Sequence, residues 1–131
     1  MLRTLCFALA AAMGVAAIAN GLYMLAAPEA WYGAVPGVTT TGPFNQHFVR
    51  DIGLIYLLAG AAYLAGALRP AYRLLLWAVP TLWLTGHALF HLWEVAVGIS
   101  HHSAMTRDFP AVTLPAVIGL GLSWWAAKDG E

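Results

Sequence analysis

Charged residues are scarce in this chain of 131 residues: only 9% are Asp, Glu, Lys or Arg, six basic against six acidic. An ordinary soluble domain carries about 25%. The formal net charge is zero and no basic cluster occurs, which argues against nucleic-acid binding. The single cysteine, Cys6, cannot form an internal disulfide or a zinc ribbon. Glycine-rich phosphate-binding motifs are also absent from the sequence, so we predict no nucleotide-binding unit.

Apolar residues, by contrast, make up 61% of the chain. No Asp, Glu, Lys or Arg occurs in four runs of 25, 17, 20 and 19 residues, at positions 4–28, 52–68, 74–93 and 109–127. A helix needs about 20 mostly apolar residues to cross the hydrocarbon core of a bilayer. The sequence therefore predicts an all-α integral membrane protein, a single domain over residues 1–131 that forms a four-helix transmembrane bundle in the lipid bilayer. The predicted helices cover about residues 2–27, 46–68, 74–97 and 109–127.

Basic residues predict how this bundle is oriented. The positive-inside rule places the side with more Lys and Arg in the cytoplasm. One predicted side carries four basic residues and the other carries only Arg50 and Arg107. Both termini (N-in/C-in) and the turn at 69–73 are then expected inside, and the loops at 28–47 and 98–108 outside. The four basic residues of the inner side are Arg3, Arg69, Arg73 and Lys128.

All five histidines fall in the outer half of the bundle under this topology. The third helix holds the most specific pattern, in which His91 follows His87 by four positions and Glu94 follows His91 by three. At about 100° per residue, these three side chains project from one face of the helix. Helical bundles use imidazole and carboxylate ligands at such spacings to bind transition metals in their interior.

A second pair lies on the preceding helix, where His47 and Asp51 are also four positions apart. Two facing helices would then bring five ligands to one metal ion. We therefore predict a site for zinc, iron or copper that opens to the outer face and performs redox or metal-assisted chemistry on a lipophilic substrate. The predicted ligands are His87, His91, Glu94, His47 and Asp51, and the predicted supporting residues are Arg50, Tyr56 and Asn20.

The same residues have other interpretations. Non-covalent haem b would need imidazoles from two helices, which His47 with His87 or His91 would provide. No Cys-x-x-Cys-His motif for covalent attachment occurs. Alternatively, the polar side chains would form a structural network, because ionisable groups within a membrane need partners that are not necessarily metals. Asp108, just before Pro110, is predicted to be the N-cap of the fourth helix.

Two further functions belong to different classes. The first is a small accessory or assembly subunit of a larger membrane complex, or a homo-oligomer. Alanines and glycines of the first helix form a surface that suits close packing between membrane helices. Gly53, Gly60 and Gly66 would serve such contacts as well. The second is a proton-coupled carrier or a quinone-binding protein, which would move protons through His, Asp and Tyr side chains near the membrane surface.

Two stretches of the chain are similar to known sequences. Residues 20–28 (NGLYMLAAP) and residues 44–57 (FNQHFVRDIGLIYL) resemble small bacterial four-helix integral membrane proteins of unknown function. The resemblance covers most of the first two helices and is loose beyond them. It implies a multi-pass protein of the bacterial inner (plasma) membrane and implies no activity.

Overall fold

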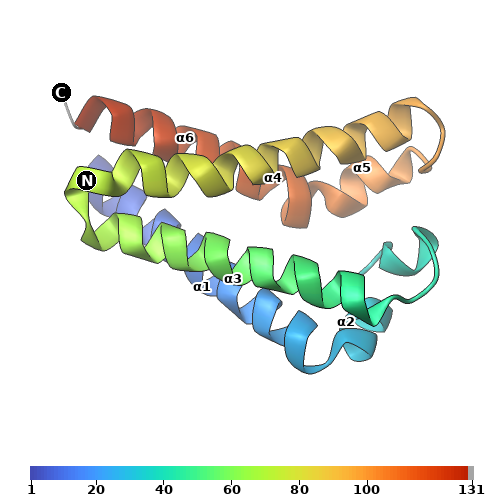
Figure 1. The fold of residues 1–131 in the computed structure, drawn as a ribbon. Coiled ribbons are helices and arrows are strands. Elements are labelled where there is room, and N and C mark those ends of the chain that lie inside the picture. Colours follow the sequence, from blue (N-terminus) through green and yellow to red (C-terminus); the bar gives the residue numbers. More distant parts are fainter. Residues whose placement is uncertain (130–131) are drawn as a thin grey trace.

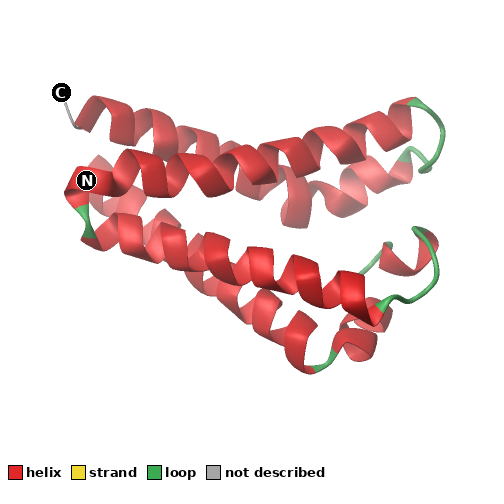
Figure 2. Ribbon diagram, viewed as in Figure 1, coloured by secondary structure: helices red, strands yellow, loops and turns green. Residues whose placement is uncertain are grey.

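The computed structural model describes residues 1–129, which fold into a bundle of helices joined by short connections (Figures 1 and 2). Four of the helical stretches are long and apolar enough to cross a membrane, which confirms the predicted all-α four-helix architecture. The long helices are α1 (Leu2–Ala26), α3 (Gln46–Leu68), α4 (Arg73–Ala96) and α6 (Leu114–Asp129). The short ones are α2 (Pro28–Ala34) and α5 (Ser103–Asp108).

The connections hold more helix than the sequence predicted. The 28–47 connection contains α2 and a 3-10 turn at Val38–Thr40, and a second 3-10 turn at Pro70–Tyr72 precedes α4. The last spanning stretch begins at Ser103 rather than near residue 109, because α5 runs into α6 through a π-helical turn at Phe109–Thr113. Pro115 lacks an N–H and cannot form the usual bond to the carbonyl four residues before it, so an irregular turn at this place has a local cause.

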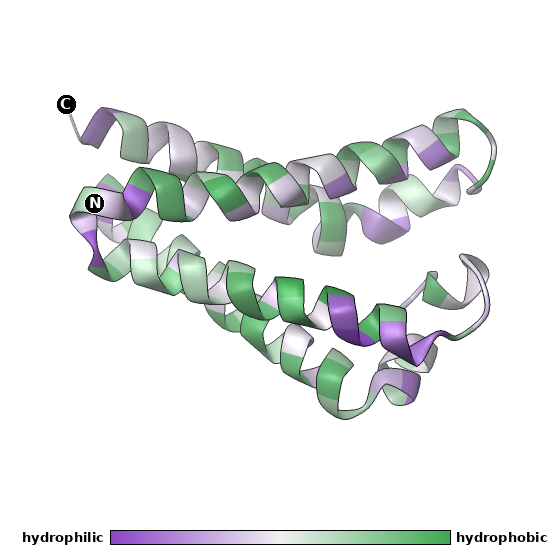
Figure 3. Cartoon of the chain, in the orientation of Figure 1, coloured by the Kyte–Doolittle hydropathy of each residue, from purple (hydrophilic) through white to green (hydrophobic). Residues whose placement is uncertain are grey.

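The four spanning helices form two antiparallel pairs. α1 packs mainly against α3, and α4 packs mainly against α6. The two pairs meet near the chain termini and diverge toward the end that carries α2 and α5 (Figure 1). Apolar residues dominate the middle of α3 and α4, whereas the first turns of α3 are hydrophilic (Figure 3). The two ends of the bundle therefore differ, one closely packed and the other spread.

Glycines allow α1 and α3 to approach closely. A Cβ atom added at Gly21 would lie 2.6 Å from the Gly53 carbonyl oxygen, and one at Gly60 would lie 2.6 Å from the Gly14 carbonyl oxygen. Backbones in such contact have no room for a larger residue. These glycines serve packing within the chain. Gly53 and Gly60 thus serve helix contacts, as predicted, and the contacts seen here lie between α1 and α3.

A small hydrogen-bonded core joins the two pairs. Trp77 donates from Nε1 to the Tyr63 carbonyl oxygen at 3.0 Å, and the Tyr63 hydroxyl lies 2.8 Å from Thr81 Oγ1. All three side chains are fully buried. Gly119 of α6 provides the space, because a Cβ there would lie 2.6 Å from Thr81 Oγ1. The buried polar atoms of Tyr63, Trp77 and Thr81 are thus paired, as the low polarity of a membrane interior requires.

Candidate functional site

The predicted metal site is wrong. Among residues 1–129, no three His, Cys, Asp or Glu side chains come together in a group that could hold a metal ion. The five predicted ligands occur instead as separate pairs or single residues. A metal-dependent activity on a lipophilic substrate therefore has no ligand set to support it within the described chain.

His47 and Asp51 form the first of these pairs. His47 Nε2 lies 3.2 Å from Asp51 Oδ2, as their spacing on one helix face permits, but 86% and 56% of the two side chains are exposed. Arg50, between them, points elsewhere: its Nε donates to the Leu25 carbonyl oxygen at 3.2 Å and its Nη1 to Gln46 Oε1 at 2.7 Å. This end of α3 faces the surface, and its polar groups contact neighbours on α1 and α3.

The two histidines of α4 lie in contact but take different partners. Their ring centres are 4.6 Å apart. The His87 ring stacks on Trp83 at 5.3 Å, and Trp83 meets the edge of Tyr56 at 5.3 Å. His91 Nδ1 lies 3.0 Å from Asp108 Oδ2. The predicted supporting residue Tyr56 thus lies in an aromatic row that ends at His87.

Other predicted site residues lie apart from this row. Asn20 accepts a hydrogen bond from Trp31 Nε1 at 2.9 Å, so it stabilises the α1–α2 corner. Glu94 forms no side-chain hydrogen bond or ion pair with any residue in the part of the chain that is described. The haem interpretation, which pairs His47 with a histidine of α4, is not tested by these contacts and stays a prediction.

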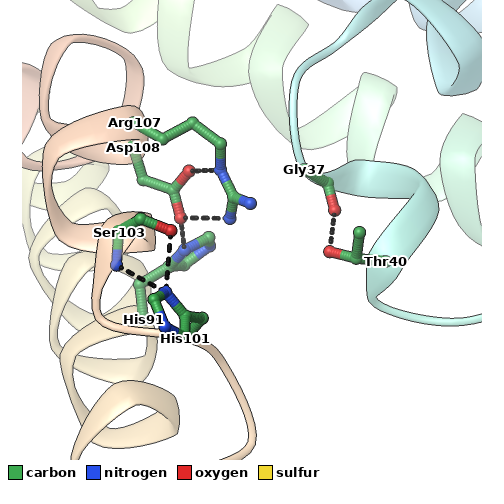
Figure 4. Close-up of polar contacts among 7 residues, drawn as sticks. All are labelled: Gly37, Thr40, His91, His101, Ser103, Arg107 and Asp108. Carbon is green, nitrogen blue, oxygen red and sulfur yellow. Dashed lines mark hydrogen bonds and ion pairs between the residues drawn. The ribbon is translucent and has the colours of Figure 1, made fainter.

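Asp108 is the centre of a polar cluster at this end of the bundle (Figure 4). Besides contacting His91, it accepts hydrogen bonds from Arg107 Nε at 2.6 Å and Arg107 Nη2 at 3.1 Å. It makes no capping bond to the following turn, so the predicted N-cap role is wrong. The cluster joins α4 to α5. His101 and Ser103 lie beside it, 3.0 Å apart between Nδ1 and Oγ.

Arg107 also contacts the other helical pair. Its guanidinium group packs against Gly37, which lies in the connection between α2 and α3. Gly37 has a φ of 88°, a conformation that residues with a Cβ rarely adopt. Figure 4 shows Gly37 on the side of the cluster opposite to α5, with Thr40 Oγ1 donating to its carbonyl oxygen at 2.6 Å. The Arg107–Gly37 contact therefore closes the spread end of the bundle.

Sequence reasoning missed the most buried charge, Arg73 of α4. Its guanidinium carbon lies 4.8 Å from the centre of the Phe7 ring and 5.8 Å from each of the Trp77 and Trp125 rings. Arg73 Nε also donates to the Gly66 carbonyl oxygen at 3.2 Å. The prediction placed Arg73 in a cytoplasmic turn and used it only to orient the chain. The available signal was the aromatic residue four positions later, which shares its helix face.

Comparison of the chain with known protein families, with curated proteins and with solved structures gives no match. The resemblance to small bacterial four-helix membrane proteins therefore stays a prediction. The structure itself shows four helical stretches that are long and apolar enough to cross a membrane.

Proposed function

We propose that this protein is a small membrane-embedded subunit that acts by associating with a second copy of itself through the outward face of α4. The observation that carries the proposal is Gly86, an open glycine at the centre of an otherwise bulky apolar face. We call this face the α4 seam. Its residues follow one another at alternating spacings of four and three, and all are exposed. They are Leu75, Val79, Leu82, Gly86, Leu89 and Trp93.

Gly86 has no role in packing among residues 1–129. A glycine inside a helix costs about 1 kcal/mol relative to alanine. At Gly14, Gly21 and Gly60 a close contact with a neighbouring helix offsets that cost. A Cβ at Gly86 would meet no atom of residues 1–129 within 4 Å. If a helix of another chain packed closely against α4, Gly86 would allow that contact as the buried glycines allow the contacts within this chain.

The spacing of the α4 seam supports a helix as the partner. Apolar residues at alternating spacings of three and four form the contact line of left-handed helix pairs, which are the usual geometry between membrane helices. Lipid alone requires an apolar face but not a glycine in it. A partner helix accounts for both features.

A second copy of the chain suits this face. Copies inserted in the same orientation meet at equal depth, so Gly86 would lie opposite Gly86 in a two-fold dimer, the commonest symmetry. No Asp, Glu, Lys or Arg occurs between residues 74 and 93, so like charges do not oppose the contact. The corresponding face of α6 also has an open glycine, Gly121, but it ends at Lys128, whose Nζ lies 4.4 Å from the Trp124 ring centre.

The proposal includes the bacterial plasma membrane as the location, with both termini in the cytoplasm. The excess of basic residues at the end where the termini lie supports this orientation. Attachment of a fluorescent protein to the C-terminus, which fluoresces only in the cytoplasm, tests it. Fluorescence is expected, and a fusion protein that is produced in the membrane but stays dark would contradict it.

The association is tested on the full chain in lipid vesicles. Donor- and acceptor-labelled copies are mixed, and energy transfer is followed as lipid is added to dilute the protein. We expect transfer above random proximity for the native chain and loss of it in Gly86→Leu. Gly121→Leu is the matched control, because a Cβ atom at Gly121, like one at Gly86, meets no described residue within 4 Å. Random-proximity transfer by the native chain, or equal loss in both variants, would overturn the proposal.

A further inference from the structure

A pocket of about 610 Å³ opens where α1 ends and α3 begins. Glu29, Phe44, Gln46 and Arg50 line it together with the α1–α2 corner. Both flanking long helices are membrane-spanning candidates, and both have their ends here. The pocket therefore lies at the level where a bilayer places its headgroups.

Arg50 is held in position at this pocket. Its Nε donates to the carbonyl oxygen of Leu25, one of the last carbonyls of α1, which have no N–H donor further along the helix. Its Nη1 donates to Gln46 Oε1 at 2.7 Å. Its Nη2 makes no hydrogen bond to any residue between 1 and 129. One terminal nitrogen of a fixed guanidinium group is thus available to an anion.

Glu29 supplies the opposite charge. It lies in the first turn of α2 and its side chain is exposed. Although Glu29 and Arg50 line one pocket, no Lys, Arg or His of the described chain lies within 4 Å of the Glu29 carboxylate. An acidic and a basic group therefore face the same space without neutralising each other.

We propose that this pocket binds the headgroup of a phospholipid that carries a phosphate and a primary ammonium, as phosphatidylethanolamine does. The phosphate accepts a charge-assisted hydrogen bond from Arg50, and the ammonium donates to Glu29. Phe44 and Pro28 provide apolar surface for the glycerol region. An anionic headgroup without the ammonium would pair with Arg50 but leave the Glu29 carboxylate without a cationic partner.

The experiment is native mass spectrometry of the full chain in detergent, titrated with phosphatidylethanolamine and, separately, with phosphatidylglycerol. We expect phosphatidylethanolamine to bind about tenfold more tightly, because only its ammonium pairs with Glu29. Phosphoethanolamine and inorganic phosphate are titrated in parallel. Binding of either soluble compound as tightly as the lipid would overturn the assignment to a membrane lipid.

Three variants complete the test. Glu29→Gln is expected to remove the preference for phosphatidylethanolamine over phosphatidylglycerol. Arg50→Gln is expected to weaken the binding of both lipids by about tenfold or more. Arg69→Gln, at the opposite end of α3, is the control and leaves binding unchanged. Arg50 also bonds α1, so Glu29→Gln keeps the test decisive if Arg50→Gln misfolds. Equal binding of both lipids by the native chain, or an unchanged preference in Glu29→Gln, would overturn the proposal. These outcomes are independent of dimerisation through α4.

Discussion

Arg73 Nη1 lies 3.0 Å from Asp129 Oδ2, and this ion pair joins the first residue of α4 to the last residue of α6. The Arg73 side chain is 7% exposed, whereas that of Asp129 is 32% exposed. Phe7 of α1 lies against the same guanidinium group, and Gly66 of α3 accepts a hydrogen bond from it. One side chain thus contacts all four spanning helices at the end where the two helical pairs meet.

We expect Arg73→Ala to destabilise the bundle by about 2–4 kcal/mol. Removing a buried cation leaves its partners unpaired and opens space among the aromatic rings. Arg73→Lys is expected to recover part of the loss, because it retains the charge but not the planar group that bonds Gly66 and Asp129 together. The measurement is reversible unfolding in mixed micelles, followed by circular dichroism. Arg69→Ala is the control. If it lowers the unfolding free energy as much as Arg73→Ala does, the contacts of the buried Arg73 side chain are not responsible for the loss of stability.

Close glycine contacts give a second prediction. Gly60→Ala is expected to destabilise the chain by about 2 kcal/mol or more, because its Cβ would lie 2.6 Å from the backbone oxygen of Gly14. Gly121→Ala adds the same atom where no described residue lies within 4 Å, and it should stabilise the helix by up to about 1 kcal/mol. Unfolding curves of the two variants measure these changes in stability. Equal effects would contradict the assignment of Gly60 to the α1–α3 contact.

The spanning helices were predictable because the length of an apolar run can be read directly from the sequence. The charge-free run at 52–68 is sufficient to place α3, and Asn45 caps it, its side chain accepting from the N–H groups of His47 and Phe48. Pairings within one helix follow the same local rule. His47 and Asp51 share a face and lie in contact, as their spacing requires.

Partners on different helices were not predictable in the same way. His91 contacts Asp108 because α5 turns back along α4, and that register depends on the packing of whole helices. The predicted metal site failed for this reason. It assumed that α3 and α4 face each other at His47 and His91, but the two helical pairs diverge toward this end (Figure 1). Burial of Arg73 was missed because a basic residue at a helix end ordinarily lies in the headgroup region.

The hydrogen-bonded core gives a third prediction, a double-mutant cycle between Tyr63 and Thr81. Tyr63→Phe removes one hydroxyl and should cost about 1 kcal/mol. Thr81→Val should cost more, because Thr81 Oγ1 also donates to the Trp77 carbonyl oxygen at 2.6 Å and lies 3.3 Å from Ser123 Oγ. The double variant is expected to cost less than the two single losses together, since both remove the same contact. Strict additivity of the three unfolding free energies would mean that the 2.8 Å contact contributes nothing.

The contact between Gly37 and Arg107 gives the last prediction, which concerns the spread end of the bundle. Gly37→Ala should loosen this end for two reasons. Its backbone, at a φ of 88°, disfavours a Cβ, and that Cβ would overlap the Arg107 guanidinium group. We expect faster amide hydrogen exchange in residues 35–41 and 103–108, and no change in the buried parts of α3 and α4.

Two comparisons separate these causes. Gly33 lies in the helix α2, where an added Cβ would meet no described residue within 4 Å. Gly33→Ala should therefore leave amide hydrogen exchange unchanged. In an Arg107→Ala background the overlap no longer exists, so Gly37→Ala should then add only the backbone cost of about 1 kcal/mol. Exchange at 103–108 that responds to Gly37→Ala equally in both backgrounds would show that Arg107 does not transmit the effect. Faster exchange confined to 35–41 would likewise contradict a contact between the two connections.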